Sequence, residues 1–298
     1  MALALHCGPQ ASRVCLTLPG ARRRLDVEIV RRGLLPSREA AQLAISEGRV
    51  TVGGAPADKP ARLVSVGDPL SVAPADHGWV SRGGQKLHAA LVRWQIDVDA
   101  RRCLDAGAST GGFTDVLLAS GARQVWAVDV GRGQLHDRLR RDPRVVVSDR
   151  TNIRLAGIDD LGGSPFEVVV ADLSFISLRT VAPVLAGTLA VPAAELIWLV
   201  KPQFEAGRAA VAPGRGVVRD AGVWRDALLG VGRALTAQQA AIMGVMTSPL
   251  RGADGNVEFL MWARAGAGPG PSGVEALVEA ALVEAALVKA ALSEVRPG

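Results

Sequence analysis

Four polar residues stand in apolar or glycine-rich surroundings, where structural reasons for a charge are scarce. Lys86 lies in SRGGQKL, Asp172 in ADLSF, Lys201 in LIWLVKPQFE and Glu258 in GNVEFLMW. Each residue has an ordinary explanation when it is taken singly, because lysines extend their amines to solvent and carboxylates cap helices. Together, two amines and two carboxylates are groups that accept, hold and deliver protons in general acid–base catalysis.

A glycine-rich turn forms a second candidate site, in LDAGASTGGFTDVLL at residues 104–118. A turn of this kind between a strand and a helix lets the backbone approach a ligand and points N–H groups at a negative group. Dinucleotide enzymes use the same device, but their usual GxGxxG spacing is not matched here. The predicted cofactor-binding residues of this turn are Asp105, Gly107, Ala108, Ser109, Thr110 and Gly111.

Three aspartates follow successive apolar runs. Asp129 ends VWAVDV, Asp149 ends VVVSD and Asp172 ends VVVAD. In a parallel sheet, the carboxyl ends of the strands meet along one crevice, which is the usual ligand edge. Asp129 has the spacing of a carboxylate that accepts hydrogen bonds from ribose hydroxyls, and we expect Asp149 to hold an adenine amino group. This order resembles class I S-adenosylmethionine-dependent methyltransferases, so S-adenosylmethionine is the expected cofactor, with Asp172 also beside it.

The elements that must position these residues are short strands alternating with helices. Six apolar runs read as buried strands, too apolar to be half-exposed: CLDAG, QVWAVDV, VVVSD, FEVVVADL, AELIWLVKP and VEFLMWA. The alternation predicts an α/β fold with a doubly wound, mostly parallel sheet over residues 83–264.

Residues 21–73 predict a separate α+β domain. LDVEIVRRGL and SREAAQLAISEGRV read as two short helices, with Ser37 as an N-cap and Gly48 as a stop. Short β-type runs follow, broken by turns at Gly53-Gly54 and Gly67-Asp68. The segment resembles the S4 RNA-binding fold, which implies contacts to RNA phosphates. The expected RNA-binding residues are Arg22, Arg23, Arg24, Arg31, Arg32, Arg38 and Lys59, together with Arg82 beyond this segment.

The charge distribution agrees with an acidic partner. The net charge of the whole chain is +5, which favours nucleic acid or an anionic membrane. Residues 21–63 carry nine basic and five acidic side chains, a local balance of +4. On charge alone, a solvated basic face is an equally good explanation.

The remaining composition predicts a reduced, cytoplasmic protein without a metal centre. Cys7, Cys15 and Cys103 form no CxxC pair and no metal-ligand spacing with the four histidines. Neither a signal peptide nor a membrane span is expected, because no apolar run is long enough. Outside the two domains we expect an extension at residues 1–20, a linker at 74–82 and a low-complexity helical tail at 265–298.

The four polar residues match the Lys-Asp-Lys-Glu tetrad of the FtsJ-like ribose 2′-O-methyltransferases. SRGGQKL, LDAGASTGGFT, ADLSFISL, LVKPQFE and GNVEF further resemble the hemolysin-named TlyA-type enzymes over residues 22–264. The resemblance implies methyl transfer to a cytidine 2′-hydroxyl of 16S or 23S ribosomal RNA, or both, within the 30S and 50S subunits. Lys201 would accept the proton, Asp172 would orient the Lys201 amine, and Lys86 and Glu258 would fix the hydroxyl and the geometry.

Several alternatives remain at this stage. Base methylation is disfavoured, because the loop after the fourth strand lacks the Asn/Asp-Pro-Pro-aromatic pattern and Cys103 lies on a buried strand. A non-catalytic ribosome-assembly factor and a membrane-active hemolysin are the rival functions. The linker reads His77-Gly78-Trp79 where relatives often carry Arg-Xaa-Trp, which leaves its role open. Trp79, Phe175 and Phe204 are candidate stacking surfaces for a flipped base.

Overall fold

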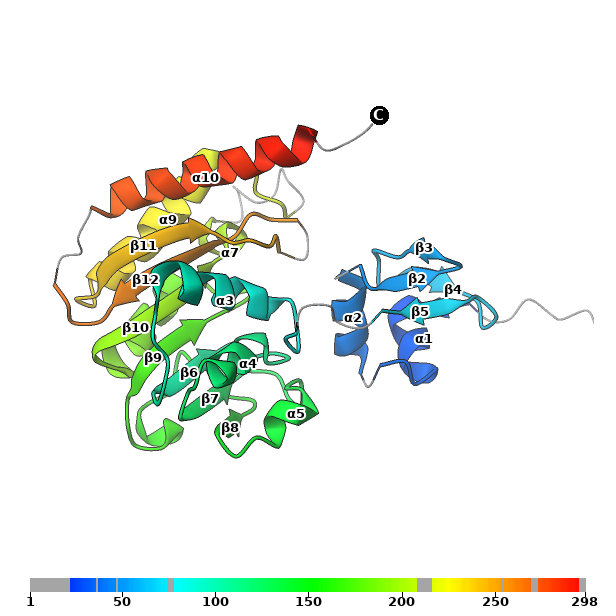
Figure 1. Cartoon of the computed structure of the whole chain (residues 1–298), viewed down its shortest axis with the longest axis horizontal. Coiled ribbons are helices and arrows are strands. Elements are labelled where there is room, and N and C mark those ends of the chain that lie inside the picture. Colours follow the sequence, from blue (N-terminus) through cyan, green and yellow to red (C-terminus); the bar gives the residue numbers. More distant parts are fainter. Residues whose placement is uncertain are drawn as a thin grey trace, which may run out of the picture. The chain divides into compact units, whose positions relative to one another are not determined.

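The computed structural model describes residues 22–35, 37–46, 48–73, 78–207, 216–252, 255–268 and 273–294. The chain forms two compact units, divided between residues 74 and 75 (Figure 1). The expected N-terminal extension and His77 of the expected linker lie outside the described residues.

The described residues of the smaller unit form two helices and five short strands. One pair of strands, β1–β4, is antiparallel, and β3–β2–β5 form a second antiparallel sheet. The elements are β1 (Arg23–Arg24), α1 (Leu25–Arg31), α2 (Arg38–Ser46), β2 (Val50–Val52), β3 (Ala55–Pro56), β4 (Leu63–Val64) and β5 (Leu70–Val72). Leu25, Ile29 and Ile45 are fully buried in the core between these elements.

The local signals of this unit are confirmed by the structure. Ser37 Oγ accepts the backbone N–H of Ala40 at 3.1 Å, as an N-cap does. Gly48 follows the end of α2 with a φ of +69°, a conformation that favours glycine. Gly53 and Gly54 form the turn between β2 and β3, both with positive φ.

The larger unit is built on one seven-stranded sheet with the order β11-β12-β10-β9-β6-β7-β8. All pairings are parallel except those of β12, which runs antiparallel to β10 and to β11. The strands are β6 (Arg102–Ala106), β7 (Gln124–Val128), β8 (Val145–Ser148), β9 (Phe166–Ala171), β10 (Ala190–Val200), β11 (Ala241–Thr247) and β12 (Phe259–Arg264). The mostly parallel sheet predicted from the sequence is therefore confirmed.

Helices cover both faces of this sheet, so the fold is doubly wound (Figure 1). One face packs against α3 (Gly83–Trp94), α4 (Gly112–Ala119) and α5 (Asp137–Arg140). The other face packs against a second set of helical segments. These are α6 (Leu178–Ala182), the π-helical turn Pro183–Thr188, α9 (Ala221–Thr236) and α10 (Val274–Glu294). The described part of the larger unit also contains the short helices Asp159–Leu161 and α7 (Pro202–Glu205).

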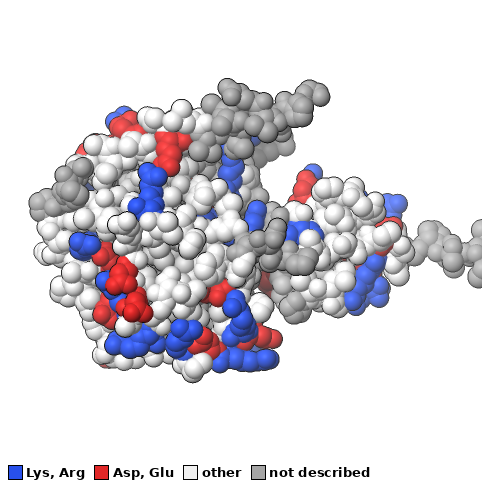
Figure 2. All heavy atoms as spheres, in the orientation of Figure 1, with Lys and Arg blue, Asp and Glu red and all other residues white. Residues whose placement is uncertain are grey.

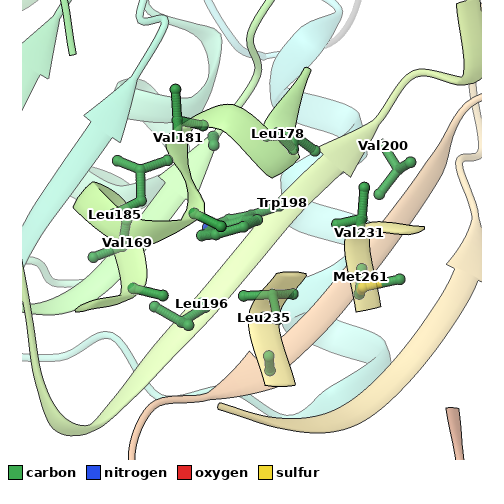
Figure 3. Packing of buried hydrophobic residues seen from close by; sticks show 14 of the residues in the cluster. Val169, Leu178, Val181, Leu185, Leu196, Trp198, Val200, Val231, Leu235 and Met261 are labelled. Carbon is green, nitrogen blue, oxygen red and sulfur yellow. The ribbon is translucent and has the colours of Figure 1, made fainter. Parts of the chain in front are cut away.

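Trp198 on β10 occupies the centre of the second face (Figure 3). Its ring is fully buried, and Val181, Leu185 and Leu196 surround it. Burial of large apolar side chains on both sides of β10 explains why this strand is almost continuously apolar. Lys201 directly follows this buried strand, so its backbone position is fixed by the core.

Two elements differ from the sequence-based expectation. The strand β11 was not predicted; Gly244 interrupts its apolar run, and the pairing register shifts between Ile242 and Gly244. The expected tail contains α10, which buries Val278, Ala281 and Ala285 against β11 and α9. The helix is therefore a layer of the larger unit, not an appendage.

No described helix is long and apolar enough to cross a membrane.

Candidate active site

The four residues of the predicted tetrad come from four elements of the larger unit. Lys86 lies in the first turn of α3, Asp172 directly follows β9, Lys201 directly follows β10, and Glu258 directly precedes β12. Because β12 is antiparallel to its neighbours, its start lies at the same sheet edge as the carboxyl ends of β9 and β10. The topology thus brings together residues separated by up to 172 positions.

The tetrad forms two close ion pairs. Lys201 Nζ lies 2.6 Å from Asp172 Oδ1, and Lys86 Nζ lies 2.6 Å from Glu258 Oε2. Glu258 is almost completely buried, and the side chains of both lysines are only 11–12% exposed. A β-carbon on Gly252 would lie 2.5 Å from Glu258 Oε1, so glycine at this position leaves room for the carboxylate.

The two pairs also interact with each other. Burial opposes ionisation of Asp172, but the cations of Lys201 and Lys86 outweigh it and hold the pKa of Asp172 below its ordinary value. The carboxylate therefore stays charged at neutral pH and can orient an amine.

The segment after Asp172 supplies further contacts that sequence reasoning missed. Ser174 Oγ accepts a hydrogen bond from Lys201 Nζ at 3.0 Å. Phe175 adopts a φ of +65°, and its ring centroid lies 5.1 Å from that of Phe204. Lys201 Nζ in turn lies 5.9 Å from the Phe204 ring centroid. Ser174 belongs to the ADLSF motif, but its neighbours in the sequence do not predict that its hydroxyl binds a lysine.

A cleft of about 510 Å³ opens beside the tetrad at the sheet edge. Its size is in the range of small-molecule sites. Gly107, Ser109, Asp129 and Asp172, four of the predicted cofactor-binding residues, line it. Other lining residues were not predicted: Val128, Val130, Gln134, Thr151, Asn152, Ile153, Arg154, Leu173, Ser174, Phe175 and Ile176.

Gly107 and Asp129 shape the floor of this cleft. Gly107 has a φ of +86°, and a β-carbon there would lie 2.6 Å from the carbonyl oxygen of Asp172, so only glycine fits. Asp129 Oδ2 accepts the N–H of Ser109 at 2.8 Å, and its Oδ1 accepts the N–H of Gly131 at 2.7 Å. Asp129 thereby fastens both loops that flank the cleft.

Asp105 and Asp149 stand apart from the cleft lining. Asp105 is fully buried beside the Thr114 hydroxyl, which donates to it at 2.6 Å. Burial raises the pKa of Asp105 to about 7 despite that hydrogen bond, and the charge of Asp172 adds to the rise. Asp149 Oδ2 accepts from the Gly133 N–H and from Arg140. Burial opposes ionisation of Asp149, but these two partners outweigh it and lower its pKa.

Three further predicted residues of the glycine-rich turn do not line the cleft. Ala108 is buried, and the Thr110 carbonyl accepts the His136 N–H at 3.2 Å. Gly111 has a φ of +97°, where a β-carbon would collide with Leu135 and Leu139. These residues shape the turn, and their contact with a cofactor stays a prediction.

The predicted RNA-binding arginines of the smaller unit are organised by two fully buried acids. Asp26 accepts from Arg24, Arg38 and Gln42, and hydrogen bonds from these side chains outweigh burial to hold its pKa well below the ordinary value. Glu28 forms ion pairs with Arg23, Arg31 and Arg32. Hydrogen bonds from Arg31 and Arg32 lower the pKa of Glu28 to about 2, because their effect exceeds that of burial, which raises the pKa.

Arg32 differs from the others, because it also donates to the carbonyl oxygens of Ser65, Val66 and Asp68. This side chain serves to fasten the turn before β5. The remaining predicted RNA-binding residues of this unit, Arg22 and Lys59, are exposed.

Arg82 lies at the start of α3 and is half-buried. Near it, Trp79 packs against Gly84, and the Trp79 ring centroid lies 5.5 Å from that of His88.

On the face drawn in Figure 2, basic and acidic spheres are interspersed along the edge near α5, and the centre of the larger unit is mostly uncharged.

The three candidate stacking residues differ in exposure. Among Trp79, Phe175 and Phe204, Phe175 alone is open to solvent, with 91% of its surface exposed at the rim of the cleft.

Comparison with known proteins agrees with this architecture. The family of FtsJ-like methyltransferases matches residues 79–265, and the S4 domain family matches residues 23–70. The 16S/23S rRNA (cytidine-2′-O)-methyltransferase TlyA of Mycobacterium tuberculosis is 51% identical over 244 residues, 82% of this chain and 90% of that protein. Hemolysin A of Brachyspira hyodysenteriae is 37% identical over 80% of this chain and 98% of that protein. The solved structure of a hemolysin-named protein from Streptococcus thermophilus superposes with a TM-score of 0.69 at 35% identity, covering 92% of this chain and 99% of the other.

The fold, the site and these matches define a methyltransferase with an N-terminal S4 domain. More particularly, the chain belongs to the TlyA group of the FtsJ-like methyltransferase family.

Proposed function

We propose that this protein transfers a methyl group from S-adenosylmethionine to the 2′-hydroxyl of a cytidine in 16S or 23S ribosomal RNA, or in both. The observation that carries the proposal is the double ion pair at the cleft, with Lys201 held 2.6 Å from Asp172 and Lys86 held 2.6 Å from Glu258. The name of the Mycobacterium tuberculosis relative supports the choice of substrate.

The residues fit the cofactor in three respects. The cleft has apolar walls from Val128, Val130 and Ile153, which suit a flat adenine ring. Asp129 offers carboxylate lone pairs that can also accept from ribose hydroxyls, and Gly107 keeps the turn close to the end of β9. When bound, S-adenosylmethionine supplies an electrophilic methyl group.

The tetrad then has to place and deprotonate a ribose hydroxyl, which is a weak acid and a poor nucleophile. Lys201 accepts the hydroxyl proton once its own ammonium has released a proton to solvent, while Asp172 and Ser174 fix the direction of the neutral amine. Lys86, held by Glu258, fixes the position of the hydroxyl. General-base help contributes roughly 100- to 10,000-fold, and much of the remainder comes from in-line alignment.

The S4 domain supplies affinity for the RNA backbone. Its exposed basic residues would neutralise phosphates, which positions the substrate without reading its sequence. Phe175 at the cleft rim would stack on the target base once that base leaves its helix. A protein that acts on ribosomal RNA in this way works in the cytoplasm.

Purified protein, methyl-labelled S-adenosylmethionine and separated 30S and 50S subunits test the proposal, with digestion of the RNA to identify the labelled nucleoside. We expect label in 2′-O-methylcytidine, and a loss of at least roughly 100-fold in rate for Lys201→Ala. Arg225→Ala is the matched control, because Arg225 forms an exposed ion pair with Glu279 between α9 and α10.

Label in a base instead of a ribose would contradict the reaction. An absence of label on both subunits and on naked RNA, from protein shown to bind S-adenosylmethionine, would favour the assembly-factor alternative.

A further inference from the structure

Glu205 is a buried carboxylate that the proposed reaction does not use. It is the last residue of α7, four residues after Lys201, and only 5% of its surface is exposed. Its carboxylate makes no contact with the tetrad, so its burial requires another explanation.

The carboxylate instead binds the beginning of α6. Oε1 accepts the backbone N–H of Leu178 at 2.7 Å, and Oε2 accepts the hydroxyl of Ser177 at 2.5 Å. Arg179 donates to Oε2 at 3.2 Å and to the backbone carbonyl of Glu205 at 2.7 Å. We name these four residues, Ser177, Leu178, Arg179 and Glu205, the Glu205 clasp.

The clasp joins two segments that each begin with a tetrad residue. Residues 172–177 run from Asp172 to the start of α6, and residues 201–205 run from Lys201 to the end of α7. Three contacts connect them in succession: Lys201 with Asp172 and Ser174, Phe204 with Phe175, and then the clasp. Within the first segment Phe175 holds a positive φ, which persists only where the surroundings over-determine the backbone.

We propose that Glu205 is a positioning residue, which holds the segment after Asp172 against the segment after Lys201 and so sets the distance between the two tetrad residues. This inference rests on the proposed function, but it concerns a residue that touches neither substrate nor cofactor. The two oxygens of its carboxylate accept from three donors of residues 177–179 at once. A neutral amide cannot reproduce this, because an amide has only one accepting oxygen.

The test compares Glu205→Gln, Glu205→Asp and Ser177→Ala with the unaltered protein. Glu279→Gln is the matched control, because Glu279 is also paired with an arginine but is exposed on α10. We expect Glu205→Gln to lower kcat roughly 10- to 100-fold while KM for S-adenosylmethionine and for RNA stay within about threefold, as for a misplaced catalytic group. Glu205→Asp should recover part of the loss, and Ser177→Ala should act in the same direction more weakly.

Two further readouts separate positioning from general destabilisation. The midpoint of the kcat–pH profile should move by about 0.5 unit or more in Glu205→Gln, because the surroundings of the proton acceptor change. Amide hydrogen exchange should become faster in residues 172–179 and 201–205, with β6 and β7 unaffected.

A loss of kcat that only follows the folded fraction, with an unchanged pH profile, would overturn the inference. Unchanged exchange in both segments would do the same. If the unaltered protein methylated no RNA, the proposed function would fail, and the exchange experiment would still decide whether Glu205 holds the two segments together.

Discussion

Two aspartates at the edge of the sheet show how surroundings decide the charge of a residue. Asp172 has two lysine cations nearby, which hold its pKa below the ordinary value against the effect of burial. Asp105 lies one strand away and has a neutral partner, the Thr114 hydroxyl, so burial dominates and its pKa rises to about 7. The first serves as a fixed anion, whereas the second is uncharged over much of the acidic range.

Asp105 therefore predicts a pH dependence of folding. The ordinary pKa is 3.8 and the folded value is about 7, so between these pH values the folded state keeps a proton that the unfolded state has released. The free energy of unfolding thus falls as pH rises through this window. In Asp105→Asn this contribution is absent, and we expect the stability of the variant relative to the unaltered protein to increase from pH 5 to pH 8.

Urea midpoints at four pH values within this range measure the difference, with Asp97→Asn as an exposed control. Parallel curves for Asp105→Asn and the unaltered protein would show that Asp105 does not titrate in this window.

Asp129 predicts an effect on cofactor binding. Its carboxylate fixes the N–H groups of Ser109 and Gly131 on both sides of the cleft. Asp129→Ala should raise the dissociation constant for S-adenosylmethionine roughly 10- to 100-fold, the usual loss for charged hydrogen bonds. Isothermal titration calorimetry checks this, with Asp160→Ala as the control, because Asp160 accepts a loop N–H from Gly157 away from the cleft. Equal effects of the two substitutions would contradict a specific role for Asp129.

The sequence was informative about some of these residues and silent about others. Lys86, Asp172, Lys201 and Glu258 were predicted because charges in apolar runs are conspicuous and because the run of motifs resembles a known family. Ser174 and Glu205 were missed, because their importance depends on contacts between segments that only the fold brings together. Arg32 was predicted to bind RNA, yet its three carbonyl partners indicate a structural role that composition cannot reveal.

Among the elements, α10 shows the limit of pattern analysis. Its five-residue repeat places Leu and Val on every side, and Val283 and Leu287 are indeed exposed. The buried stripe nevertheless exists, since Val278, Ala281 and Ala285 recur at helical spacing. The sequence pattern did not reveal this stripe, because two of its three residues are alanines. Alanine fits a close helix contact but gives only a weak hydrophobic signal.

The strand β11 was missed for a related reason. Gly244 interrupts its apolar run, and glycine within a strand pattern usually weakens the prediction. In the fold a β-carbon on Gly244 would lie 2.7 Å from the Trp94 ring, so the glycine makes room for an aromatic side chain of α3.

The packing of α10 predicts a sharp contrast between two substitutions on one helix. Ala281→Asp buries a carboxylate against β11 and should cost roughly 3 kcal/mol or more of stability. Val283→Asp changes an exposed residue and should stay within about 0.5 kcal/mol. Thermal unfolding of both variants measures the difference. Equal losses, or none, would show that α10 does not cover the sheet in solution.

On the scale of the whole molecule, most residues expected to bind RNA and the residues of the candidate active site lie in different units. The smaller unit has its own core and carries all but one of the basic residues expected to contact RNA, whereas the larger unit carries Arg82, the cleft and the tetrad. The sequence predicted both units from their local patterns. The sequence did not predict that Asp26 and Glu28 form ion pairs with the arginines, because such buried pairs leave no periodic pattern of residues in the sequence.

This division predicts two separable kinds of basic residue in the smaller unit. Lys59 is exposed, so Lys59→Ala should weaken RNA binding evenly across sequences and reduce the slope of log K against log salt by about 1. At saturating RNA, kcat should be unchanged. Arg32→Ala removes bonds to Glu28 and to three carbonyl oxygens, and should destabilise the unit by about 2 kcal/mol or more.

Binding titrations of the full-length variants between roughly 50 and 200 mM salt, together with thermal unfolding, distinguish the two effects. An unchanged salt slope for Lys59→Ala would remove Lys59 from the RNA surface. A reduced slope for Arg32→Ala without a loss of stability would make Arg32 a phosphate contact, because an arginine that only fastens a turn cannot alter the number of counterions released on binding.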